Sequence, residues 1–438
     1  MLYTLSSDVP NPKPNGASAV GRHTWYPYYA GYSPLFVQQV LERANLSPTS
    51  VVCDPWNGAG TTTQVAYDLG YPAVGFDLNP VMVIVARSRL VAPSQISALR
   101  DHLGRILRRV YSCKPNMFSQ NDPLSLWIQP CSILAARQLE CAIWEEFYDE
   151  VENFQKQSQS WNISKEAALF YTAIFRCLFR LSKRFRTSNP TWLKVPRNTE
   201  DRLCFVTADF VRIFEAEVAQ MLSSLEGESI LASNINHTST VKIEVTSSDD
   251  LPVNNQEIDI VITSPPYCTR IDYAVSTSLE LAFLGFDYNT SVRRLRDRMI
   301  GTSTVRNILP EENPRWGLTC NNFLNQIRNH FSKASRSYYL KTHLQYFHDI
   351  FRSLLEIDRV LRRGSDCIFV VQDSYYKDIH NDLASIVIEM VSSIQWQVIE
   401  RQNFPVRLTM ARVNRHAQRY RRASEAVESV LWFKIPNS

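Results

Sequence analysis

Residues 51–77 read VVCDPWNGAGTTTQVAYDLGYPAVGFD, and this stretch decides the fold. An apolar run that begins at Val51 ends in a turn-rich segment with two glycines, and a helical pattern leads to a second apolar run at 73–77. A strand, a glycine turn, a helix and a second strand in this order form a βαβ unit, with which a parallel doubly wound sheet begins. The stretch therefore predicts an α/β fold.

Five further apolar runs complete the predicted sheet, for a total of seven strands. The run EIDIVIT alternates isoleucine with other residues and contains Val261, as a buried strand does. The five runs are VKIEV from 241, EIDIVIT from 257, CIFVVQD from 367, WQVIERQ from 396 and SVLWFKI from 429.

About 150 residues without a strand signal separate the second and third strands, which is too long for a plain loop. Apolar residues recur there at helical spacing, so we predict a helical insertion at 94–235. The first part of the α/β domain then comprises residues 1–93, of which 1–20 read as a flexible lead-in, and the rest comprises 236–438. Within this last part we predict an irregular insertion at about 283–340, then a long amphipathic helix that Gly364 ends.

The charge of the chain is unevenly distributed. The 47 basic and 43 acidic residues give a formal net charge of only +4. Residues 176–197 and 401–422 each contain seven basic residues and no acidic one, so the rest of the chain sums to −10. An acidic body with two basic patches is how a polyanion-binding site looks in a sequence, although solvated surface arginines would look the same.

Nine cysteines are widely spaced and include no CxxC pair, and the histidines do not cluster with them. We expect reduced thiols and no metal site. The beginning of the chain shows no signal-peptide pattern and no apolar run approaches a membrane span, so we expect a cytoplasmic protein.

The segment DPWNGAGTT at 54–62 follows the first strand, where an open α/β sheet binds its ligand. A dinucleotide fingerprint would need glycine at Thr63, and a phosphate-binding P-loop would need Lys-Ser/Thr after Gly60. Asp54 suits an amine-bearing ligand, and Asp77, at the end of the next strand, suits ribose hydroxyls. An adenosine joined to a charged amino acid fits both features, and S-adenosylmethionine is such a molecule.

The segment TSPPY at 263–267 follows the fourth strand. Its two prolines stiffen the backbone and cannot donate hydrogen bonds, so the Ser264 hydroxyl and the Pro265 carbonyl are presented as acceptors. Two convergent acceptors suit an exocyclic amine, because they bind both of its hydrogens and free its lone pair to attack a methyl group. Tyr267 offers a ring on which a base can stack, worth about 1–3 kcal/mol.

DPWNGAGTT, FDLNP from 76 and TSPPY resemble motifs of the S-adenosylmethionine-dependent amino-methyltransferases that act on DNA and make N4-methylcytosine or N6-methyladenine. The resemblance covers about half of the chain. It implies a Rossmann-like, seven-stranded methyltransferase sheet, mostly parallel with the last strand antiparallel. Serine at the start of SPPY is more typical of the cytosine-N4 enzymes. The segment from Trp25 lies where the family has an additional cofactor-contacting motif, although an apolar cap on the sheet is an equal reading.

Residue roles follow from this resemblance. It implies that the acid after the third strand holds the adenine, and Asp249 is the first candidate, with Ser248 and Asp250 as alternatives. The implied catalytic pocket is Ser264, Pro265, Pro266 and Tyr267. The implied cofactor-binding residues are Asp54, Pro55, Trp56, Gly58, Gly60, Thr61, Asp77, Asp249 and Thr263.

The expected substrate is double-stranded DNA, and a base within a duplex reaches such a pocket only by flipping out. The basic patches then supply phosphate contacts. A cognate restriction endonuclease is a partner that the resemblance suggests, and the sequence leaves the oligomeric state open. The candidate DNA-binding residues are Arg184, Arg186, Trp192, Lys194, Arg407, Arg412, Arg415 and Arg419.

The sequence thus predicts a site-specific DNA methyltransferase that acts on the N4 amine of cytosine. The alternatives are an adenine-N6 DNA methyltransferase, an RNA methyltransferase that acts on a base amine, and a non-catalytic nucleic-acid-binding protein with a relict cofactor fold.

Overall fold

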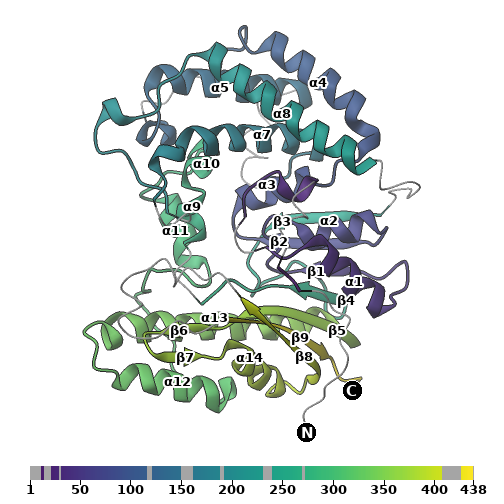
Figure 1. Ribbon diagram of the computed structural model, residues 1–438, viewed down its shortest axis with the longest axis vertical. Coiled ribbons are helices and arrows are strands. Elements are labelled where there is room, and N and C mark those ends of the chain that lie inside the picture. Colours follow the sequence, from purple (N-terminus) through teal and green to yellow (C-terminus); the bar gives the residue numbers. More distant parts are fainter. Residues whose placement is uncertain are drawn as a thin grey trace.

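A seven-stranded sheet in the order β3-β2-β1-β4-β5-β9-β8 forms the centre of the molecule (Figure 1). The computed structural model describes residues 11–13, 21–28, 31–115, 121–148, 161–187, 192–229, 239–268, 272–406 and 426–437. The strands of the sheet are β1 Val52–Asp54, β2 Ala73–Asp77, β3 Val241–Val245, β4 Ile258–Thr263, β5 Leu361–Gln372, β8 Gln397–Val406 and β9 Ala426–Lys434.

Strands β1 to β5 run parallel, and β9 pairs antiparallel with both β5 and β8. The predicted seven-stranded sheet with an antiparallel last strand is therefore confirmed. Two short strands that the sequence did not predict, β6 Ser374–Tyr376 and β7 Ile379–Asn381, form a separate antiparallel pair.

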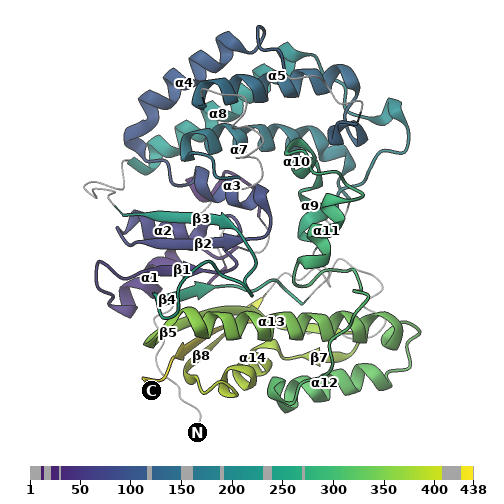
Figure 2. The same cartoon turned by 180° about the vertical axis from the view of Figure 1, so that it is seen from behind.

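Side chains on the central strands alternate between two cores. On β4, Ile260 and Ile262 pack with α1 and α2, whereas Val261 faces the opposite core, which contains α12, α13 and α14. On β5, Ile368 likewise belongs to the core with α1 and α2, and Phe369 belongs to the opposite core. Figure 2 shows α12, α13 and α14 along one side of the sheet. The helices of the two layers are α1 Pro34–Ala44, α2 Thr61–Asp68, α12 Gly317–Asn329, α13 Leu340–Val360 and α14 Leu383–Ser392.

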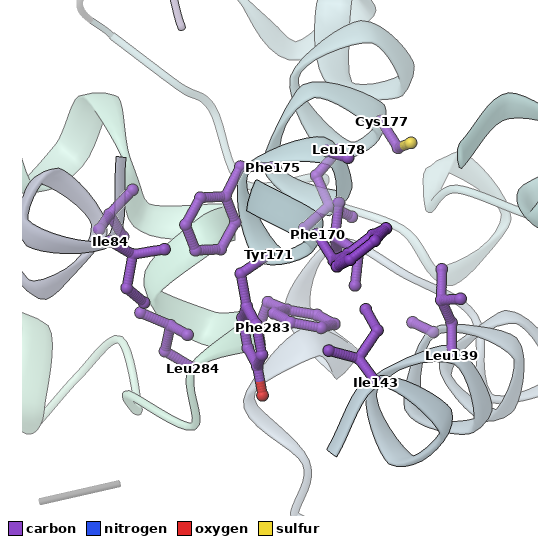
Figure 3. Packing of buried hydrophobic residues seen from close by; sticks show 14 of the residues in the cluster. Ile84, Leu139, Ile143, Phe170, Tyr171, Phe175, Cys177, Leu178, Phe283 and Leu284 are labelled. Atoms are coloured by element: carbon purple, nitrogen blue, oxygen red, sulfur yellow. The ribbon is translucent and has the colours of Figure 1, made fainter. Parts of the chain in front are cut away.

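A helical body lies beyond the β3 edge of the sheet (Figure 1). It includes the helices of residues 94–235, where the sequence predicted a helical insertion. Phe170, Tyr171 and Phe175 on α7 pack against Leu139 on α5 and Phe283 on α10 (Figure 3). The same core includes residues of α3, so the body and the sheet share buried surface. The helices concerned are α3 Pro80–Ser88, α4 Ile96–Arg109, α5 Pro130–Phe147, α7 Lys165–Leu181, α8 Thr207–Ser229, α9 Tyr273–Ser276, α10 Ser278–Phe283 and α11 Ser291–Arg298.

Two predictions about the second half of the chain need correction. Residues 283–340 are not wholly irregular, because they contain α11 and α12. Gly364 does not end the long helix: α13 stops at Val360, and Gly364 lies in β5 with φ of +78°. The pairing of β4 with β5 shifts register between Ile258 and Ile260, and the left-handed backbone of Gly364 falls in the irregular part of β5 that this shift creates.

No helix within the described ranges has both the length and the apolar character needed to cross a membrane.

Candidate active site

Asp54 connects the loop after β1, which contains DPWNGAGTT, with the TSPPY segment at the end of the neighbouring strand β4. The Thr263 hydroxyl donates to Asp54 Oδ1 at 2.5 Å, and the Trp56 backbone N–H donates to the same oxygen at 3.1 Å. The Tyr32 hydroxyl donates to Oδ2 at 2.9 Å. Asp54 is only 2% exposed, and its burial raises the pKa of the carboxyl, which the hydrogen bonds from Thr263, Thr62 and Tyr32 oppose. The carboxylate therefore braces the loops against each other, and a direct contact with a ligand stays a prediction.

The two glycines of the first loop are required by close packing. Gly58 and Gly60 have φ of +49° and +83°, a region that favours glycine. A Cβ on Gly60 would lie 2.5 Å from the Cβ of Ala86 on α3, and a Cβ on Gly58 would lie 2.8 Å from the ring of Tyr28. The loop can therefore pass between α3 and the N-terminal segment only because side chains are absent at both positions.

Asp77 holds the turn after β2. Its Oδ2 accepts from the backbone N–H of Gly58 at 3.0 Å, and its Oδ1 accepts from that of Asn79 at 2.7 Å. Burial raises the pKa of the Asp77 carboxyl to about 6, even though these hydrogen bonds oppose the shift. Each oxygen has a second lone pair, which a hydroxyl donor can use.

A cavity that is partly open to solvent lies at these strand ends. Six of the predicted catalytic and cofactor-binding residues line it: Pro55, Trp56, Asp77, Ser264, Pro265 and Pro266. The residues that line it and that the sequence did not single out as site residues include Tyr26, Tyr28, Asn79, Phe179, Tyr273 and Thr277. The tyrosines at 26 and 28 belong to the segment from Trp25, so this segment forms part of the cavity wall.

The other predicted cofactor residues do not line this cavity. Asp249 lines an adjoining polar hollow, which shares Thr246 and Ile300 with the cavity. Asp249 forms an ion pair with Arg352 at 3.3 Å, whereas Ser248, an alternative for the same role, lines the cavity. The remaining five, Asp54, Gly58, Gly60, Thr61 and Thr263, are absent from its lining. The predicted catalytic residue Tyr267, which directly follows Pro266, is absent from it as well.

The SPPY loop is held in place by two tyrosines from other elements. The hydroxyl of Tyr346 on α13 donates to the Pro266 carbonyl oxygen at 2.9 Å, and the backbone N–H of Tyr267 donates to the Tyr273 hydroxyl at 3.4 Å. Within the described residues, no side chain forms a hydrogen bond with the Ser264 hydroxyl or the Pro265 carbonyl oxygen. These two acceptors are therefore available at the cavity wall.

The chain has no matching family model, but its sequence aligns with several characterised proteins. It is 24% identical to the type II methyltransferase M.BsoBI of Geobacillus stearothermophilus, over 65% of this chain and 56% of that protein. It is 22% identical to M.MvaI of Kocuria varians over 84% of this chain and 80% of that protein. It is 24% identical to M.AvaI of Nostoc sp., over 81% of this chain and 74% of that protein.

The chain is a relative of type II DNA methyltransferases. It spans little more than half the length of M.BsoBI. Among solved structures, YcgJ from Bacillus subtilis has a TM-score of 0.31 at 9% identity over 92% of this chain and 98% of its own, a likeness too low to support any conclusion.

S-adenosylmethionine is the methyl donor that this relationship to methyltransferases implies, and the residues of the cavity fit it. The Asp77 carboxylate has lone pairs for ribose hydroxyls, and the side chains of Leu78, Met82 and Ile300 offer apolar walls for a purine. The buried Nε1–H of Trp56 has no acceptor among the described residues, so a ligand in the cavity can supply one.

The candidate DNA-binding residues fall into three groups. Arg186 lines the cavity, with its guanidinium 3.8 Å from the ring centroid of Phe179. Arg184 and Lys194 are exposed, as is Trp192, and Arg184 also donates to the Asp201 carbonyl at 2.8 Å. The remaining four, Arg407, Arg412, Arg415 and Arg419, lie outside the described residues.

The charge count for residues 176–197 overstates the free positive charge of this stretch. Glu217 on α8 forms ion pairs with Arg176 at 2.7 Å and with Arg180 at 3.4 Å. The count along the chain missed this acid because α8 packs beside α7 only in the folded protein. Arg186 also lies 4.0 Å from the buried carboxylate of Glu280, so three of the seven basic residues of this stretch have an acidic partner.

Three potential metal ligands, Cys113, Cys141 and Glu145, have donor atoms within 4.8 Å of one another. Structural zinc takes four ligands, and the described part of the chain adds no fourth to this group.

Proposed function

We propose that this protein is a site-specific DNA methyltransferase that transfers a methyl group from S-adenosylmethionine to the exocyclic N4 amine of cytosine in duplex DNA. One observation carries the proposal: Ser264 Oγ and Pro265 O, which accept from no side chain of the described residues, lie on the wall of the same cavity as Asp77. The names of the sequence relatives support the coarser statement, a type II methyltransferase.

The chain's own residues bind and orient the reacting groups. Ser264 and the Pro265 carbonyl each accept one hydrogen of the target amine, which fixes the nitrogen and turns its lone pair towards the methyl donor. When bound, S-adenosylmethionine supplies a methyl group on a positively charged sulfur, which takes the electron pair of the broken bond. The amine nitrogen gains the positive charge on transfer and then releases one of its two protons to water. Asp77 accepts hydrogen bonds from the ribose hydroxyls and so sets the position of the donor in the cavity.

A target base must leave the duplex to reach this wall, so base flipping is part of the proposal. The choice of cytosine rests on serine at the first position of SPPY, where the resembling cytosine-N4 enzymes usually have it.

The test is transfer of labelled methyl groups from the cofactor to duplex DNA, followed by digestion to nucleosides. We expect the label in N4-methylcytosine, and label only in N6-methyladenine would contradict the choice of base. Parallel reactions with tRNA and rRNA decide the substrate class, since preferential labelling of RNA would contradict DNA as the substrate.

A further inference from the structure

Lys13 contacts the tyrosine of the SPPY loop from a part of the chain that the sequence predicted to be a flexible lead-in. Its Nζ donates to the Tyr267 hydroxyl at 2.9 Å. The same Nζ forms an ion pair at 3.0 Å with Glu428 on β9. Three groups that are far apart in the sequence thus meet at the end of one tyrosine side chain.

The backbone beside Lys13 is anchored as well. The Pro12 carbonyl accepts a hydrogen bond from the backbone N–H of Ser33 at 2.7 Å. Ser33 caps the first turn of α1, because its side chain accepts from the Phe36 N–H. Residues 11–13 are therefore fixed to α1, and through it to the sheet.

The lysine holds the hydroxyl end of the ring. Its Nζ is 2.9 Å from the Tyr267 hydroxyl oxygen but 5.4 Å from the ring centroid. The other end of the ring is fixed by its own backbone, whose N–H donates to Tyr273, and by the Tyr346 contact to the preceding carbonyl. Both ends of the Tyr267 side chain are thus held, which restricts the plane of the ring.

The charge of Lys13 is matched by a nearly inaccessible carboxylate. Glu428 is 1% exposed, and a buried carboxylate is costly unless it is paired. Burial would lower the pKa of Lys13, but the neighbouring oxygens of Tyr267 and Glu428 outweigh it and raise the pKa, so the ammonium stays charged. The bond to Tyr267 is therefore charge-assisted, which makes it stronger than one between neutral groups.

We propose that Lys13 and Glu428 are positioning residues that set the plane of the Tyr267 ring on which the flipped target base stacks. The inference rests on the proposed function, because the base that stacks on the ring is the target of the proposed methyl transfer. Base stacking on an aromatic ring is worth about 1–3 kcal/mol, so a misplaced ring is expected to lower kcat/KM for DNA by about fivefold to a hundredfold.

The test compares three variants of the full chain. The double variant Lys13→Met/Glu428→Gln removes the contact without leaving an isolated charge, and Lys13→Arg keeps a charged donor. Lys434→Met is the matched control, because Lys434 on the same strand β9 forms an ion pair with Asp366 at 3.2 Å.

We expect the double variant to lose at least about fivefold in kcat/KM for DNA while its Kd for S-adenosylmethionine stays within twofold of the wild type. Lys13→Arg is expected to recover most of the activity, and Lys434→Met to retain it. Unchanged kcat/KM in the double variant, or equal losses in cofactor and DNA binding, would overturn the inference.

A second measurement does not depend on methyl transfer. In ring-labelled tyrosine NMR spectra, with the signal assigned through Tyr267→Phe, the Tyr267 resonance should move in the double variant and stay in place in Lys434→Met. An unmoved resonance would overturn the inference even if the wild type methylates DNA. If the wild type methylates no DNA but the resonance still moves in the double variant, the result supports the contact and contradicts the proposed function instead.

Discussion

Because Gly60 packs tightly against α3, adding a single methyl group at this position is expected to lower both the stability of the protein and its affinity for the cofactor. Gly60→Ala would place a Cβ 2.5 Å from the Cβ and 2.9 Å from the Cα of Ala86, at a φ of +83°. The backbone of α3 cannot move away easily, because every residue of this helix is buried. The substitution therefore combines backbone strain with a clash that a rotating side chain cannot relieve.

Gly70 provides a matched control at nearly the same backbone angle. Its φ is +84°, and a Cβ there would meet nothing within 4 Å. Gly70→Ala should cost the left-handed strain alone, about 1–2 kcal/mol of unfolding free energy. Gly60→Ala adds overpacking of about 1–3 kcal/mol, so we expect a loss of about 2–5 kcal/mol in total.

Chemical denaturation of both variants measures these losses, and calorimetry measures their Kd for S-adenosylmethionine. Because Gly60 ends the loop that carries Pro55 and Trp56, we expect Gly60→Ala to weaken cofactor binding at least about tenfold, the equivalent of 1.4 kcal/mol. Gly70→Ala should bind the cofactor like the wild type. Equal stability losses and equal cofactor affinities in the two variants would refute the packing argument.

Three further predictions concern the cavity, the loop and DNA. Asp77 has a pKa of about 6, against about 3.9 in an unfolded chain, so the folded protein binds more protons between these values. The contribution of Asp77 to the free energy of unfolding should therefore decline as pH rises from about 4 to 6. The affinity for the cofactor, measured by calorimetry, should instead rise through pH 6 as the carboxylate ionises. A flat affinity profile would contradict the ribose role, and Asp77→Asn should remove the pH dependence. Tyr346→Phe should cost about 1 kcal/mol in denaturation and lower kcat with little change in cofactor Kd, and an unchanged kcat would show that the Pro266 contact is dispensable. DNA affinity should fall with salt by a slope of about 0.9 per phosphate neutralised, and affinity that is indifferent to salt would exclude the basic patches as DNA contacts.

The sheet was predictable because its signals are local. The alternation of Ile260, Val261 and Ile262 matches two cores on opposite faces, and the glycine turn at 58–60 has the positive φ values that it requires. Gly364 was misread because a left-handed glycine after a helix and one at an irregularity within a strand look alike in sequence. Only the register between β4 and β5, which is set by distant residues, distinguishes them.

The site was predictable where strand ends converge, as for Trp56, Asp77 and Ser264. The missed residues act across long separations in the chain. Tyr346 lies 80 residues after the carbonyl that it holds, and Lys13 lies 254 residues before Tyr267. No local pattern marks such a residue. The charge count for residues 176–197 was incomplete for the same reason, since Glu217 on α8 pairs with arginines of α7.

The central claim is that Ser264 and the Pro265 carbonyl hold the amine of a target cytosine beside the bound cofactor. The most direct measurement is single-turnover methylation of duplex DNA by the wild type and by Ser264→Ala, with cofactor Kd determined for both. The account predicts N4-methylcytosine from the wild type, and a methyl-transfer rate at least about tenfold lower in Ser264→Ala at unchanged cofactor Kd. Undiminished methylation by Ser264→Ala, or no methylated cytosine from the wild type, would contradict it.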